Sequence, residues 1–201
     1  MKQILIFVTA LLIFSACTTP SANRGPASEP VPTHYIFLVH GITGDQTHFG
    51  AMKEALNVHL NRLNPQYRYD ISPFDYDTKS DVKDVMDFAN DINAKIMAHL
   101  KAKGFGPKDK ISIVAHSQGG IVMSIWLFRL FTQVPGYGNG PESVNIRPDQ
   151  MDSFVTLGTP FWGSKLATFV KSTLNWGSRF KVNFDPTGIY GNKQLLDMSF
   201  N

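Results

Sequence analysis

Short apolar runs alternate with longer amphipathic stretches along most of this chain. Four runs rich in aromatic and β-branched residues predict strands, at Tyr35–Val39, Tyr67–Phe74, Ile111–Ala115 and Phe154–Leu157. Three stretches with apolar residues three or four positions apart predict helices, at Phe49–Leu63, Val82–Leu100 and Ile121–Phe131. Ser80 or Asp81 is expected to cap the second helix, and Gly104 to end it. Strands separated by helices favour an α/β fold with a mainly parallel sheet and helices on both faces.

The most unusual loops of the chain each follow a predicted strand directly. They are His40–Asp45, His116–Gly120 and Gly158–Ser164. In a parallel sheet the carboxyl ends of the strands meet at one edge, and ligands bind just outside that edge. We therefore expect the three loops to form one site.

The loop around Ser117 has the pattern of a nucleophile on a sharp turn. Ala115 and Gly119, two residues before and after the serine, are small enough for a tight turn from strand to helix. Such a turn exposes the Ser117 hydroxyl and directs the backbone N–H of Gln118 toward an oxyanion beside it. Gly120 would let the helix pack closely on the next strand. The alternative is a serine in an ordinary turn with no chemistry.

The loop after the first predicted strand holds two glycines, Gly41 and Gly44, which let the backbone fold back beside a substrate. The N–H of Ile42 is then a candidate second donor to the oxyanion. His40 is interpreted as a structural hydrogen-bonding residue rather than a base. The alternative is a plain glycine turn that connects strand and helix.

Taken in order, the segments His40–Gly44, Ala115–Gly120 and Leu157–Ser164 resemble the α/β-hydrolase lipases and esterases. The resemblance implies an ester hydrolase that forms an acyl-enzyme at Ser117, with Ile42 and Gln118 as oxyanion donors. It also implies supporting roles in the two motifs for His40, Gly41, Gly44, His116, Gly119 and Gly120. The expected substrate is an acyl ester or lipid.

The histidine that this mechanism needs does not follow Ser117. In this fold the chain order is serine, acid, histidine, yet all six histidines precede Ser117. One interpretation is that the chain is the N-terminal portion of a longer enzyme, with an incomplete sheet and with the acid and histidine beyond Asn201. The other is a non-catalytic envelope lipoprotein on the same fold. Asp185 is the best internal candidate for the acid, although a turn aspartate before Pro186 fits it better.

The N-terminus is typical of an exported protein. Residues 1–16 hold a basic start, an apolar core and small residues, which is the pattern of a signal peptide. Cys17 follows directly and resembles the lipidated cysteine of bacterial lipoproteins; the alternative is an ordinary signal peptide with a free thiol. Residues 17–32 are expected to be a flexible tether and residues 33–201 the hydrolase domain. These features predict a lipid-anchored protein of the bacterial cell envelope, at the outer membrane.

Composition narrows the remaining possibilities. The net charge is +3 and no run of lysine or arginine occurs, so a nucleic-acid partner is not expected. A single cysteine excludes a disulfide framework within the chain and a zinc site built from cysteines. We expect neither a cofactor nor a metal. The aromatic segment 161–184 is expected to form part of a lid over an acyl pocket, or else to pack in the core.

Overall fold

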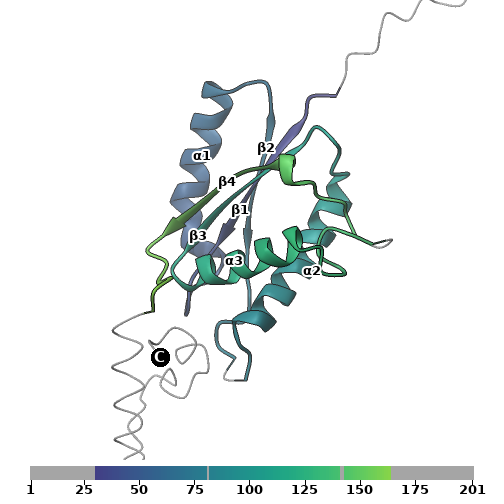
Figure 1. Ribbon diagram of the computed structural model, residues 1–201. Helices are drawn as coiled ribbons and strands as arrows, with labels where there is room; N and C mark the ends of the chain where they lie inside the picture. Colours follow the sequence, from purple (N-terminus) through teal and green to yellow (C-terminus); the bar gives the residue numbers. More distant parts are fainter. Residues whose placement is uncertain (1–29, 81, 141–142, 164–201) are drawn as a thin grey trace, which may run out of the picture. The chain divides into compact units, whose positions relative to one another are not determined.

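The computed structural model describes residues 30–80, 82–140 and 143–163. Their four strands form one parallel sheet in the order β2-β1-β3-β4 (Figure 1). The strands are β1 (Thr33–Val39), β2 (Arg68–Phe74), β3 (Lys110–His116) and β4 (Met151–Leu157). This confirms the α/β class and the parallel sheet predicted from the sequence. Pro73, which cannot donate a backbone hydrogen bond, lies in β2 at the edge of this sheet, where such a residue is tolerated.

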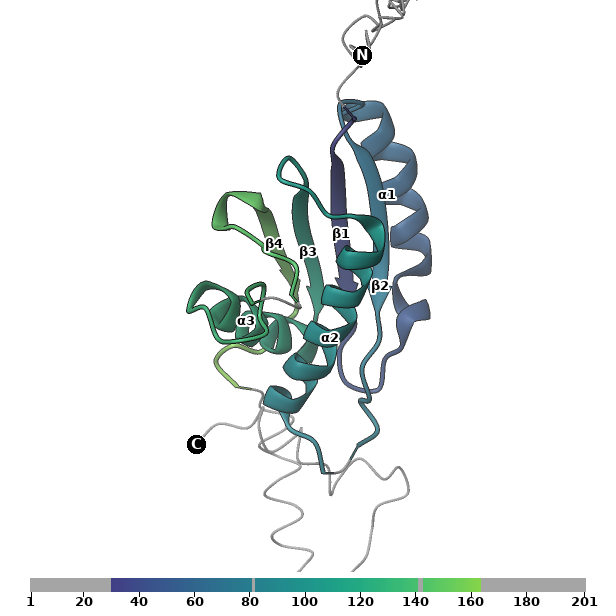
Figure 2. The same cartoon turned by 90° about the vertical axis from the view of Figure 1, so that its right-hand side faces the viewer.

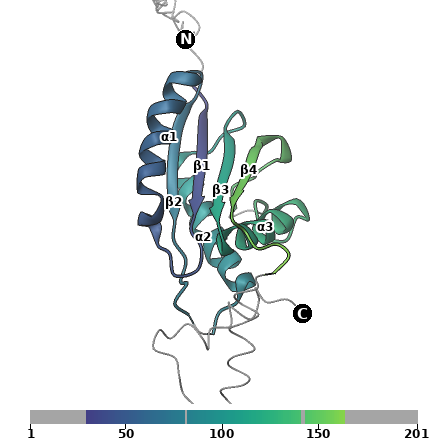
Figure 3. The same ribbon diagram turned by 90° about the vertical axis from the view of Figure 1, so that its left-hand side faces the viewer.

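Helices cover both faces of the sheet, as Figures 2 and 3 show from opposite sides. Helix α1 (Gly50–Leu63) packs on one face, and α2 (Val85–Lys103) and α3 (Gln118–Phe131) pack on the other. Successive side chains of β1 point to opposite faces. Phe37 therefore joins the larger core with α2 and α3, whereas Leu38 joins the smaller core with α1. Two short 3₁₀ helices, η1 (Gln46–Phe49) and η2 (Pro148–Gln150), precede α1 and β4.

Helix α2 begins later than the sequence pattern predicts. Its N-cap is Asp84, which accepts hydrogen bonds from the backbone N–H groups of Met86 and Asp87. Ser80 does not cap the helix, because its hydroxyl accepts hydrogen bonds from Val82 and Lys83 in the preceding turn. Val82 consequently lies outside the helix and is 76% exposed, so its assignment to the buried face was wrong. The predicted end is confirmed, since Gly104 caps the helix in a left-handed conformation.

The strand order creates a divergence point at the centre of the sheet. The connection that leaves β1 passes over one face through α1 to β2, and the connection that leaves β3 passes over the other face through α3 to β4. Loops after two adjacent strands that diverge in this way leave a crevice at the carboxyl ends, where ligands bind. The loops that follow β1 and β3 are the two that carry the predicted oxyanion donors and Ser117.

The predictions for the N-terminal segment fall largely outside the described part of the chain. The signal peptide (residues 1–16), Cys17 and residues 18–29 of the tether lie there, as does Asp185. Among the residues that the structure describes, every helix is too short or too polar to span a bilayer.

Candidate active site

Ser117 occupies the turn between β3 and α3 in a backbone conformation that serine rarely adopts. Its φ is 52° and its ψ is −126°. A side chain at positive φ costs about 1–3 kcal/mol and persists only where the surrounding structure enforces it. Here the N–H of Ser117 donates to the Leu157 carbonyl at 2.9 Å, which ties the turn to the end of β4. The strained turn is the geometry that the sequence motif requires of a nucleophile.

The first turn of α3 presses against the end of β1. A Cβ atom on Gly119 would lie 2.7 Å from the carbonyl oxygen of Val39 and still closer to that of His40. Only glycine therefore lets the helix begin at this distance from the strand. Gln118 is the first residue of α3, and a helix leaves its first N–H groups without intrahelical acceptors. The helix dipole adds positive potential at the same place.

The loop after β1 contacts the Ser117 turn directly. A Cβ on Gly41 would lie only 2.6 Å from the Cβ of Ser117 and 3.2 Å from its hydroxyl oxygen. The Gly44 N–H donates to the Gly41 carbonyl at 3.1 Å and closes a four-residue turn. Within that turn Thr43 has φ of 60°, an unusual value for a β-branched residue. The structure thus brings together the two motifs in which the sequence placed the oxyanion donors and the nucleophile.

His40 is completely buried, and both of its ring nitrogens have partners. Its Nδ1 lies 2.9 Å from the carbonyl oxygen of Gly41, and its Nε2 lies 2.6 Å from a carboxylate oxygen of Asp75. Its ring stacks on Tyr76, with the ring centres 4.7 Å apart and the planes 3° from parallel. The Tyr76 hydroxyl donates to the His40 carbonyl oxygen at 2.9 Å.

Sequence reasoning did not identify Asp75 and Tyr76. They form the loop after β2, which ends at the same edge of the sheet as the loops after β1 and β3. That position could have identified them from the sequence, because every loop at the carboxyl edge of a parallel sheet is a candidate for the ligand site. Neither residue belongs to a recognisable local motif.

His116 and His48 form a second histidine arrangement beside Ser117. Their rings stack, with centres 4.9 Å apart and planes inclined by 24°. Burial, and secondarily the nearby His48, lowers the pKa of His116 below its ordinary value. Within residues 30–80, 82–140 and 143–163, no histidine nitrogen hydrogen-bonds to the Ser117 hydroxyl.

Unpartnered buried polar atoms gather around this turn. In the part of the chain that the structure describes, they are Nδ1 of His116, Nε2 of Gln118 and Oγ1 of Thr159. Gln118 is fully buried, and its Oε1 lies 3.4 Å from the Tyr76 hydroxyl oxygen. A buried donor or acceptor without a partner costs about 1–3 kcal/mol. Two of the three atoms belong to the residues that flank Ser117, and the third belongs to the loop after β4.

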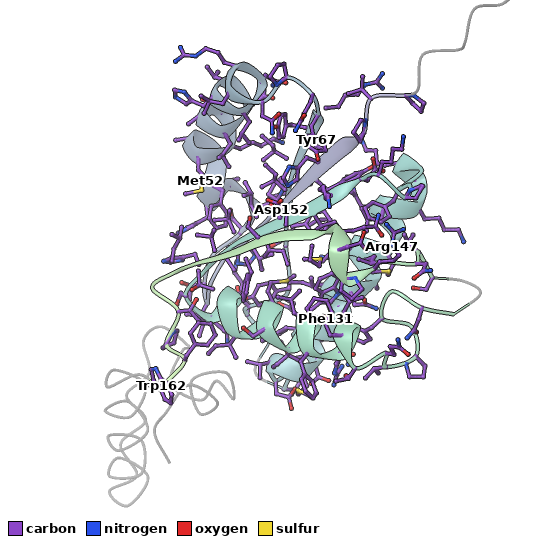
Figure 4. The ribbon with its side chains drawn as sticks, turned by 45° about the horizontal axis from the view of Figure 1, so that its top comes forward. Met52, Tyr67, Phe131, Arg147, Asp152 and Trp162 are labelled. Atoms are coloured by element: carbon purple, nitrogen blue, oxygen red, sulfur yellow. The ribbon has the colours of Figure 1, made fainter. Side chains whose placement is uncertain are left out.

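The loop after β4 brings exposed aromatic side chains to the same edge. Phe161 is 51% exposed and Trp162 is 90% exposed, and Trp162 projects away from the sheet (Figure 4). The Thr159 side chain packs against Gly120 in the first turn of α3. Ser164 and the rest of the aromatic segment to residue 184 lie outside the described residues.

A different serine, histidine and aspartate meet on the α1 side of the sheet. Ser112 Oγ lies 2.8 Å from His34 Nε2 and 3.4 Å from Asp152 Oδ2, and the Ser153 hydroxyl donates to Ser112 at 2.8 Å. Ser112 lies within β3 and is 6% exposed. These side chains satisfy one another in the sheet, away from the loops at its carboxyl edge. What distinguishes Ser117 is therefore its backbone conformation and its loop setting, not a hydrogen bond to a histidine.

The described residues around Ser117 do not form a metal cluster. No three histidine, cysteine, aspartate or glutamate side chains among them gather as metal ligands would. A cavity of about 640 Å³ lies between α2 and the loop after α3, where Asn93, Met97 and Gly136 line it. It does not include the Ser117 turn.

Comparison with known proteins gives one family match and several structural ones. A family model described as "Putative serine esterase (DUF676)" matches residues 29–191. Phospholipase PlaB from Legionella pneumophila is similar in structure, with a TM-score of 0.58 and 20% sequence identity over 84% of this chain and 33% of that chain. The same phospholipase in complex with thio-NAD has a TM-score of 0.53 and 17% identity, over 84% and 32% of the two chains.

A third solved structure, an iodinated complex of acetyl xylan esterase, has a TM-score of 0.41 and 16% identity over 68% of each chain. The two phospholipase matches show an α/β-hydrolase-like fold. This chain spans about a third of the length of the phospholipase.

Proposed function

The chain belongs to the family described as "Putative serine esterase (DUF676)", and we propose that it hydrolyses carboxylic esters through an acyl-enzyme on Ser117. The observation that carries this proposal is the strained serine at the junction of β3 and α3, where φ is 52°. A rare conformation at a motif serine, beside a helix N-terminus and a glycine loop, supports a role as nucleophile.

The reaction would proceed in two steps at this turn. Ser117 Oγ attacks the ester carbonyl carbon as its proton passes to a base, and the carbonyl oxygen becomes an oxyanion. The N–H groups of Ile42 and Gln118 are the proposed donors to that oxyanion. Departure of the protonated alcohol leaves the acyl group on Ser117, and water then releases it as the carboxylic acid.

The proposed substrate is an ester with an apolar acyl chain, such as a lipid. The exposed Phe161 and Trp162 support this choice, because aromatic side chains beside the site offer an apolar surface to an acyl chain. The name of the structurally similar Legionella phospholipase points in the same direction.

We further propose that Cys17 carries a lipid that holds the domain at the bacterial outer membrane. The support is the sequence of residues 1–17, in which a basic start, an apolar core and small residues precede the cysteine. Stable anchoring takes two lipid chains, because a single acyl chain binds a membrane only marginally. A lipid-anchored ester hydrolase would meet its substrate at the membrane surface.

The test is hydrolysis of p-nitrophenyl esters of increasing chain length by the protein expressed from its complete reading frame. We expect Ser117→Ala to abolish hydrolysis, and Ser112→Ala, the matched control with its own histidine neighbour, to retain it. Hydrolysis that survives Ser117→Ala would contradict the proposal. Absence of hydrolysis in a folded wild-type protein would favour a non-catalytic envelope lipoprotein instead.

A further inference from the structure

The carbonyl oxygen of Gly41 accepts two hydrogen bonds. One comes from Nδ1 of His40 at 2.9 Å and the other from the N–H of Gly44 at 3.1 Å. A carbonyl oxygen has two lone pairs, so both are occupied. This carbonyl and the N–H of Ile42 belong to the same planar trans peptide group and point in opposite directions. Whatever fixes the Gly41 carbonyl therefore also fixes the direction of the Ile42 N–H.

His40 is in turn held by Asp75. Nδ1 faces a carbonyl oxygen and Nε2 faces a carboxylate oxygen at 2.6 Å, and both of these oxygens are acceptors. The two contacts are both hydrogen bonds only when each ring nitrogen carries a proton. An ionised carboxylate only accepts hydrogen bonds, so the ring nitrogen is the donor in this contact. The result is a charge-assisted pair, which is shorter and stronger than a neutral hydrogen bond.

The surroundings of the His40 ring restrict its movement. The His40 side chain is fully buried, although the Asp75 side chain is 47% exposed. Tyr76 stacks on the imidazole ring and also donates its hydroxyl hydrogen to the His40 carbonyl. One side of the ring and both of its nitrogens are thus in contact with fixed groups.

We propose that Asp75, acting through His40, is a positioning residue that orients and polarises the Gly41–Ile42 peptide as an oxyanion donor. A charged donor on the Gly41 carbonyl withdraws electrons from that peptide and strengthens the Ile42 N–H, since hydrogen bonds in a chain reinforce one another. Donors that are fixed before the reaction stabilise the transition state without reorganisation. The inference rests on the proposed esterase activity and adds a residue from the loop after β2 to it.

Two substitutions separate orientation from polarisation. In Asp75→Asn the amide can still donate to an unprotonated Nε2, so His40 keeps its place but loses its charge. Asp75→Ala removes both the charge and the contact. We expect kcat to fall about tenfold in Asp75→Asn and about a hundredfold in Asp75→Ala, which is the low end of the loss caused by removing an oxyanion donor. KM should stay within twofold, because the interaction strengthens only in the transition state.

Asp77→Asn is the matched control, because Asp77 is exposed two residues further along the same loop. Its kcat and KM should equal those of the wild type. Urea unfolding of all variants confirms that the compared proteins are folded. A kcat within twofold of wild type in folded Asp75→Ala would overturn the proposal.

Nitrogen-15 NMR of the His40 ring gives a readout that does not depend on activity. We expect two ring N–H signals for His40 in the wild type at neutral pH and one in Asp75→Asn. A single ring N–H signal in the wild type would overturn the charged pair even if hydrolysis is normal. Absence of hydrolysis dependent on Ser117, with both ring signals present, would instead count against the esterase proposal alone.

Discussion

Substitution of Gly41 by alanine tests the contact between the loop after β1 and the Ser117 turn. The new Cβ would lie 2.6 Å from Ser117 Cβ and 3.0 Å from the His116 carbonyl oxygen. Carbon atoms in contact are normally about 3.5–4.0 Å apart, so the loop and the turn would have to separate by about 1 Å. Neither neighbour is the end of a flexible side chain, and Ser117 is already strained.

The separation should affect both stability and activity. Excess volume in a packed site costs about 1–3 kcal/mol in the free energy of unfolding. A displacement of 1 Å in a catalytic group can lower the rate about a hundredfold. We therefore expect Gly41→Ala to remain folded, with a lower urea midpoint and a kcat for p-nitrophenyl ester hydrolysis about a hundredfold below wild type.

Gly50→Ala is the matched control for this substitution. Gly50 is the first residue of α1, has φ of −49°, and would place its Cβ in open space. Alanine there should stabilise the helix by up to about 1 kcal/mol and leave kcat unchanged. A kcat within twofold of wild type for Gly41→Ala, or an equal loss in both variants, would show that a side chain at position 41 does not displace the Ser117 turn.

Two further predictions concern pH and the membrane. Burial lowers the pKa of both His34 and His116 below 6.5, so the unfolded chain binds more protons just below that pH. The contribution of these two histidines to the free energy of unfolding should be fully present above pH 6.5 and should be lost as the pH falls through their folded pKa values. A urea midpoint that stays constant between pH 7.5 and 5.5 would contradict this. Cys17→Ser should move the protein from the membrane fraction to the soluble fraction and abolish incorporation of a labelled fatty acid, whereas retained incorporation would exclude Cys17 as the attachment site.

Local sequence was sufficient to predict the Ser117 turn. The small residues Ala115, Gly119 and Gly120 stand at the spacing that the motif requires, so their pattern is visible in the sequence although Gly119 contacts the end of β1. The same holds for Gly104, whose left-handed conformation ends α2 as predicted. The two central strands, β1 and β3, were equally predictable, because strands buried on both faces are largely continuous apolar runs.

The partners of His40 could not be predicted in this way. Asp75 lies 35 residues from His40 along the chain and meets it only because β1 and β2 are adjacent and end at the same edge. The stack of His48 on His116 depends likewise on the position of η1 relative to β3. The start of α2 was misplaced because several polar residues in succession can cap a helix, and only the folded turn determines that Asp84 does so.

The role of Ser117 as nucleophile is tested most directly by labelling the protein from its complete reading frame with a fluorophosphonate, followed by mass spectrometry of the peptides. The probe reacts with activated serines and not with merely exposed ones. We expect one adduct, on Ser117, that is absent from Ser117→Ala and retained in Ser112→Ala. A folded protein that takes up no probe, or that carries the adduct on a serine other than Ser117, would contradict the assignment of Ser117 as the nucleophile.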